Sequence, residues 1–277
     1  SFPMILTREA SWELAEGTKT ETAALYQRMD AYEEKWLEYL PVDPLESVQM
    51  LSFSGNGVTS DLEAVTRYLT VGCMRNLKEH VEVADGSSPW EQQDTEVFPC
   101  AISESVMDAY GMVVGERLWL RCENGESVPF EITGILKPSS DRDFYWNTPL
   151  TAYNKYLFIS EETMDVLLQK YGISKLLCRQ QLLLDYSRLS CTELSLCKSH
   201  AEQFLEADPS LTISFLEVLQ DAEEQIHSVS LLLWALELPC MVLLLLFLYM
   251  VSTRLMQWEE GEMAVLRSRG VTRGQIL

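Results

Sequence analysis

One stretch near the C-terminus limits what this chain can fold into more than any other. Residues 229–251, VSLLLWALELPCMVLLLLFLYMV, are apolar apart from Ser230 and Glu237. About 20 mostly apolar residues are enough to cross the hydrocarbon core of a bilayer. In lipid, a helix is the form in which a single segment satisfies its own backbone hydrogen bonds. The stretch therefore predicts a transmembrane helix.

The charged residues on the two sides of this stretch differ in sign. No Lys or Arg lies between Lys198 and Arg254, whereas acidic residues are frequent before the span. Four arginines follow it: Arg254, Arg267, Arg269 and Arg273. Because basic residues favour the cytoplasmic side of a membrane, we expect a cytoplasmic tail and a large extracytoplasmic part.

Composition excludes several classes of function. The formal net charge of -21 argues against nucleic acid and against lying flat on anionic lipid. It favours solubility or cationic partners. The seven cysteines form no CxxC pair, so a zinc site is poorly supported, and buried free thiols are expected for most. The start of the chain has no signal-peptide pattern, from which we expect an upstream membrane helix before Ser1.

Residues 14–40 predict a long amphipathic helix. Leu25, Met29, Trp36 and Leu40 recur at helical spacing among acidic residues. Such a helix could pack on a sheet or form a stalk that continues an upstream membrane helix. The stalk is favoured, because a second long helix is expected at the other end of the domain.

The middle of the chain alternates between strand and helix patterns. An Asn124-Gly125 turn between alternating apolar residues predicts a β-hairpin over 118–132. The expected strands are residues 48–53, 98–102, 156–159, 176–186 and 211–215. The expected helices are residues 60–80, 103–111, 160–172 and 191–205. Residues 54–57 are expected to form a turn, and residues 84–96 a loop. This pattern predicts an α+β domain of two subdomains.

From Leu216 to Trp258 the helix pattern is interrupted only at Pro239. A continuous helix here would be roughly 60 Å long at about 1.5 Å per residue. Glu237 is an ionisable residue inside the span, and such residues usually face a bundle interior or water. Two interpretations are weighted equally. In the first, Glu237 contacts partner helices and Pro239 provides a hinge. In the second, Glu237 lies near the outer interface of the membrane and is solvated.

Three aromatic residues, Phe144, Tyr145 and Trp146, stand together in the loop 137–149. A loop of this kind can contact a partner or fold back onto an apolar groove. Both interpretations stay open for this loop.

The tail after the span resembles the cytoplasmic segment of FtsX-like ABC transporter permeases. The resemblance rests on Glu262, Met263, Ala264, Leu266, Arg267, Gly270 and Ile276, which match the family pattern in order. Gly261 stands where the family often has Arg. Residues 101–138, with Gly115 and the sequence Gly134-Ile135-Leu136-Lys137-Pro138, resemble the periplasmic core domain of MacB-like members.

The resemblance implies a bacterial cell-membrane permease subunit of which this chain is a fragment. It implies a stalk helix over 1–45, a MacB-like domain over 46–215, a stalk and transmembrane helix over 216–258, and a coupling segment over 259–277. The implied partners are a cytoplasmic ATPase, which would contact Glu262, Met263, Leu266, Arg267 and Gly270, and a second permease subunit in a homodimer or heterodimer. The implied function is mechanotransmission, in which the long helices transmit motion of the ATPase to the extracytoplasmic domain. Family members act in this way on peptides, lipoproteins, antibiotics or external proteins.

No catalytic constellation emerges from the sequence. The three histidines are far apart, acidic pairs suit solvated helix faces, and no P-loop is present. We therefore expect a non-catalytic subunit with no cofactor and no metal. The alternative is a single-pass receptor or adhesion module whose external domain binds a ligand.

Overall fold

The computed structural model describes residues 4–14, 21–40, 42–59, 67–90, 96–122, 125–140, 142–185, 187 and 190–268. Of residues 59, 67, 191, 192, 217, 223 and 259–268 it describes the backbone alone. The chain divides into two compact units, Ser1–Leu219 and Gln220–Leu277. The predicted α+β class with a long apolar C-terminal helix is confirmed.

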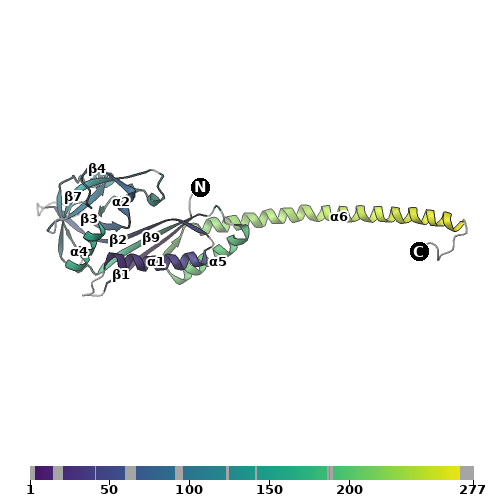
Figure 1. Ribbon diagram of the computed structural model, residues 1–277, viewed down its shortest axis with the longest axis horizontal. Coiled ribbons are helices and arrows are strands. Elements are labelled where there is room, and N and C mark those ends of the chain that lie inside the picture. The colour runs from purple at the N-terminus through teal and green to yellow at the C-terminus, as the bar shows by residue number, and fades with distance from the viewer. Residues whose placement is uncertain are drawn as a thin grey trace. The chain divides into compact units, whose positions relative to one another are not determined.

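Ten strands and six α-helices make up the described residues (Figure 1). The strands are β1 Met4–Glu13, β2 Asp43–Thr59, β3 Arg67–Met74, β4 Val81–Gly86, β5 Phe98–Ser103, β6 Arg117–Arg121, β7 Ser127–Pro138, β8 Tyr156–Phe158, β9 Lys175–Asp185 and β10 Leu211–Ile213. The helices are α1 Thr22–Tyr39, α2 Leu77–His80, α3 Glu104–Tyr110, α4 Glu161–Lys170, α5 Cys191–Ala207 and α6 Leu216–Ser268, with 3-10 turns η1 Phe144–Trp146 and η2 Leu150–Ala152.

One mixed sheet organises the first unit. Its strands follow the order β10-β1-β9-β2-β3-β8-β5-β7-β4, and β6 pairs with both β2 and β7. Those last two pairings close a ring of six strands, β2-β3-β8-β5-β7-β6, at one end of the sheet. The long strands β1, β2 and β9 form an open part of the sheet beside the ring, and Figure 1 shows α1 alongside them.

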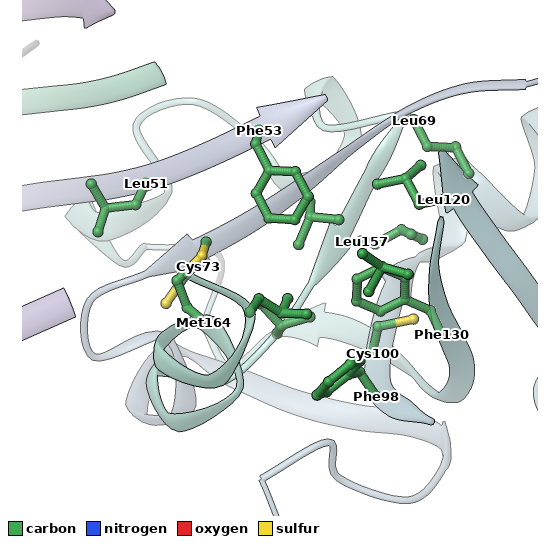
Figure 2. Packing of buried hydrophobic residues seen from close by; sticks show 14 of the residues in the cluster. Leu51, Phe53, Leu69, Cys73, Phe98, Cys100, Leu120, Phe130, Leu157 and Met164 are labelled. Carbon is green, nitrogen blue, oxygen red and sulfur yellow. The ribbon is translucent and has the colours of Figure 1, made fainter. Parts of the chain in front are cut away.

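The ring closes because apolar side chains alternate along its strands and meet inside it. Phe53, Leu69, Leu120, Phe130 and Leu157 come from five of the six strands and are all buried. Figure 2 shows these side chains pointing toward one another. Each strand therefore contributes every second residue to one shared core.

Gly55 allows β6 to approach β2 closely enough to complete the ring. A Cβ at Gly55 would lie 2.6 Å from the carbonyl oxygen of Arg121, closer than real side chains come. The prediction of a turn at residues 54–57 is wrong, because β2 runs straight through them and pairs on both sides at Asn56 and Gly57. A glycine inside a strand here marks close backbone approach.

The expected helix over residues 60–80 is also wrong where the structure describes it. Residues 67–74 form β3, and only Leu77–His80 is helical. The inward residues Leu69, Val71 and Cys73 are fully buried in the ring, so packing in the sheet decided the conformation. Residues 60–66 lie outside the described part of the chain. Likewise, residues 84–86, the start of the loop expected over 84–96, belong to the edge strand β4.

The predicted stalk at residues 1–45 is wrong. Residues 4–13 form β1, which lies inside the sheet between β9 and β10. Helix α1 begins only at Thr22, and its side chains Leu25, Met29 and Trp36 are buried against the sheet. The apolar stripe that suggested a stalk is therefore the face of a sheet-packed helix.

A buried polar layer also holds α1 on the sheet. Gln49 of β2 donates to Asp30 Oδ1 and Glu33 Oε1, both at 2.9 Å. Gln180 of β9 donates to the same Glu33 oxygen at 2.7 Å and to the Met29 carbonyl at 2.9 Å. Because both glutamines are 1% exposed, moving α1 away would leave buried donors unpaired.

Other local predictions are confirmed. The predicted hairpin is formed by β6 and β7, in which Leu118 pairs with Phe130. Ser160 caps α4 by accepting a hydrogen bond from the Thr163 amide at 3.1 Å. Gly111 ends α3 with a positive φ of 65°. The expected elements near 156–159, 176–186, 191–205 and 211–215 appear as β8, β9, α5 and β10.

Candidate membrane-coupling site

Helix α6 contains a candidate membrane span. Residues Val218–Trp258 are long and apolar enough to cross a bilayer, with a mean hydropathy of 2.5 in the most apolar window. The side chains of that window are not buried within the protein, as expected for a surface that lipid covers. The helix continues without a break from Leu216 to Ser268, ten residues beyond the predicted end at Trp258.

Glu237 and Pro239 both lie within this helix. Pro239 has no N–H, so the Ala235 carbonyl loses its usual intrahelical donor. The backbone nevertheless stays helical through this point. The Glu237 side chain is exposed. A hinge at Pro239 and a partner for Glu237 stay predictions.

The tail is described only in part. Residues Glu262, Met263, Leu266 and Arg267 are helical in their backbone, as the continuation of α6. Gly270 and the rest of the coupling pattern lie outside the described residues. The structure thus places these four predicted contact residues on one helix.

The start of α6 is fixed to the sheet of the first unit. Ser214, just before α6, donates from its amide and its hydroxyl to the carbonyl of Ile5 in β1, at 3.2 and 3.1 Å. Phe215 and Leu219 are buried in the same apolar cluster as Leu6. The first turn of α6 therefore has a defined attachment to β1.

An ion pair strengthens this attachment. Arg8 of β1 donates from Nε to Asp208 Oδ2 at 2.7 Å, and the Arg8 side chain is only 9% exposed. The Arg8 guanidinium also stacks on the ring of Tyr32 in α1, 3.9 Å from its centroid. Asp208 caps the end of α5 and precedes β10. Sequence reasoning missed this pair because 200 residues separate its members.

The local surroundings of Asp208 favour its ionised form. Partial burial by itself would raise the pKa, but hydrogen bonds from Ser210 and from Arg8 outweigh it, so the pKa of Asp208 is lowered. A carboxylate with a lowered pKa contributes stability above its unfolded pKa of about 3.9. That contribution is lost as the pH falls through the lower, folded value.

An Asp208→Asn variant is therefore expected to unfold at a lower temperature than the wild-type protein at pH 7. The difference should shrink below about pH 4, where the wild-type carboxylate is also neutralised. Thermal unfolding followed by circular dichroism at both pH values measures it. Glu206→Gln, on the exposed side of α5, is the matched control. An Asp208→Asn difference that did not change with pH would contradict the role of the charge.

The aromatic loop mostly folds inward. Tyr145 is 2% exposed, stacks on His80 with 3.9 Å between ring centroids and donates to the Arg75 carbonyl at 2.9 Å. Trp146 donates to the His80 carbonyl at 2.8 Å. A partner-contact role is thus wrong for Tyr145, which is part of the core. Phe144, at 49% exposed, stays available for a partner.

Five of the six cysteines that the structure describes are buried. Cys73, Cys100, Cys122, Cys178 and Cys197 are buried free thiols, as expected. Burial raises the pKa of Cys73 and that of Cys178 to about 12, so these groups stay protonated and poorly nucleophilic. No group of three or more His, Cys, Asp or Glu residues in the described ranges could hold a metal ion.

Comparison with known proteins gives similarities of fold. The periplasmic region of MacB from Actinobacillus actinomycetemcomitans matches at 14% identity and a TM-score of 0.38, covering 79% of this chain and 92% of that one. A domain of a protein described as a permease from Porphyromonas gingivalis matches at 15% identity and a TM-score of 0.34, covering 77% and 91%. No family model and no curated protein sequence matches the chain.

Proposed function

We propose that this chain is part of an ABC transporter permease subunit that couples a separate cytoplasmic ATPase to an extracytoplasmic domain. One observation carries the proposal. A single unbroken helix, Leu216–Ser268, begins at a turn bonded to β1 and runs through the apolar span into the segment that matches the coupling pattern. A helix satisfies its own backbone hydrogen bonds and is stiff along its axis, so a displacement of the tail would move the other end.

The distribution of charge supports the proposed orientation. Acidic residues crowd the first part of α6, including Asp221 and Glu224, and arginines follow the span. By the preference of basic residues for the cytoplasmic side, this distribution favours an orientation with the first unit outside the membrane and the tail in the cytoplasm. The ATPase would then be a different protein that binds the tail, and the subunit itself would carry out no chemical reaction.

Co-purification of the full-length permease with its ATPase tests the proposal. Glu262→Arg and Gly270→Trp are expected to reduce the amount of ATPase recovered about tenfold, since a reversed charge and a bulky ring would each disturb a helix docking surface. Glu259→Arg, which lies outside the matched pattern, serves as the control. Unchanged recovery with both variants would exclude the tail as the coupling segment and favour a single-pass receptor.

We further propose that Glu237 contacts another membrane helix of the permease. An ionised carboxylate at membrane depth is costly unless it is paired or reaches water. Glu237→Gln is expected to reduce ATP-driven activity of the assembled permease while leaving ATPase recovery unchanged. Activity equal to that of the wild-type permease would instead indicate a solvated carboxylate near the outer interface.

A further inference from the structure

A groove lined by both polar and apolar residues adjoins a strip of aromatic and basic side chains on the outer surface of the first unit. The groove has a volume of about 190 Å³ and lies between the ends of β1 and β9 and the ring strands. Its lining includes Ser11, Ser52, Ser54, Tyr68 and Lys175. We propose that the groove and the strip together bind an acidic polysaccharide, a role separate from the coupling function proposed above.

The strand register places the strip next to the groove. Asn56 of β2 pairs with Tyr68 of β3 on one side and with Arg121 of β6 on the other. Trp119, two residues before Arg121, pairs with Val58. Residues two apart on a strand share a face. Tyr68 and Trp119 therefore lie on the outer face. Their Cα atoms are separated by two strand spacings across the sheet and two residues along the strand, which gives a distance of roughly 12 Å.

The two aromatic rings are open to solvent although their sequence neighbours are not. Tyr68 is 55% exposed and Trp119 is 38% exposed, whereas Leu69 and Leu120 on the inward face are fully buried. The negative face of an aromatic ring attracts the weakly positive C–H groups of a sugar ring, and burying that ring removes apolar area from water. Two such rings, separated along the strip, suit a chain of sugar units.

Two cations, Arg121 and Lys155, lie near these rings in a strongly acidic protein. Arg121 is exposed and its guanidinium has no ion-pair partner within the part of the chain that the structure describes. Lys155 places its ammonium 5.7 Å from the centre of the Tyr68 ring. Because the whole chain has a net charge of -21, these cations mark a local site for negatively charged groups. Arg117 is already paired with Glu131 at 2.7 Å.

The shape favours part of a long polar chain over a compact ligand or an extended peptide. Pockets that enclose a whole small molecule usually exceed about 300 Å³, which is larger than this groove. Both edges of β2 at Asn56 are already paired, so a peptide could not add as a further strand. The groove is also lined by Ser11 and Ser174, which are both exposed, and their hydroxyl groups suit a ligand rich in hydroxyl groups.

Binding of a short oligogalacturonate to the full chain in detergent tests the proposal, measured by calorimetry and by tryptophan fluorescence. The oligosaccharide is expected to bind, and more weakly as salt is added. Arg121→Gln and Trp119→Ala should each weaken binding about tenfold. Trp119→Phe should keep most of the affinity but lose the fluorescence change, which separates a role in binding from a loss of folding.

Three comparisons make the outcome decisive. The methyl-esterified oligosaccharide, which lacks the charges, should bind more weakly than the acid form. Lys78→Gln and Phe144→Ala, exposed residues away from the strip, should bind like the wild-type protein. Absence of binding, or an equal loss in these controls, would overturn the proposal. Equally tight binding of polyglutamate with the same dependence on Arg121 would also overturn it, by identifying an acidic peptide as the partner.

Discussion

A Phe130→Ala variant is expected to lose about 3–5 kcal/mol of unfolding free energy, the largest effect among the stability changes considered. Phe130 has no exposed area and packs against Phe98 with 6.1 Å between ring centroids. It is surrounded by strands that close on one another, so they cannot move inward to fill the space that the ring leaves. Domains of ordinary stability have only about 5–15 kcal/mol in total.

Urea unfolding of the full chain in detergent, followed by circular dichroism, measures this loss. Phe144→Ala is the matched control, because the same side chain is 49% exposed there and its removal should change the free energy by less than about 0.5 kcal/mol. Equal unfolding midpoints for Phe130→Ala and the wild-type protein would show that the stability of the six-strand ring does not depend on this residue.

Inserting four glycines between Glu224 and Gln225 is expected to uncouple the permease, if the proposed function is correct. These residues lie in α6 before the apolar stretch, and their side chains are exposed. Each glycine destabilises a helix by about 1 kcal/mol relative to alanine, so four cost about 4 kcal/mol. Since about 1.4 kcal/mol corresponds to a tenfold change, most molecules would lose the continuous helix.

Four alanines at the same place are the control, because they add about one turn and leave the helix intact. A dye attached at S140C in the first unit would report an ATP-dependent change in fluorescence in the assembled permease. The signal should fall about tenfold or more with glycine and persist with alanine. An equal signal from the two insertions would contradict transmission through a rigid helix.

Local patterns in the sequence predicted most of the local structure. The Asn124-Gly125 turn gave the β6–β7 hairpin, Ser160 gave the start of α4, and the apolar stretch gave the span in α6. Each of these depends on residues within a few positions of one another. Interactions of that range are visible in the order of residues alone.

The errors arose where distant parts of the chain decide the conformation. Gly55 looks like a turn residue until β6 is placed beside it. The apolar positions of α1 do not show whether a sheet or an upstream helix covers them, and β1 supplies part of that sheet. The Arg8–Asp208 pair and the Tyr68–Asn56–Arg121 row likewise exist only once the register is known.

The pairing of β10 with β1 has a mechanical consequence. β10, which leads into α6, pairs with β1 over three positions, and β1 pairs with β9 over ten. Antiparallel hydrogen bonds lie across the strands, so a pull along a strand loads them in shear, all at once, and does not peel them one by one. A load on β10 would pass to β1 through the three-pair ladder, which Arg8–Asp208 would hold in register, and from β1 to β9 through the longer ladder of ten pairs.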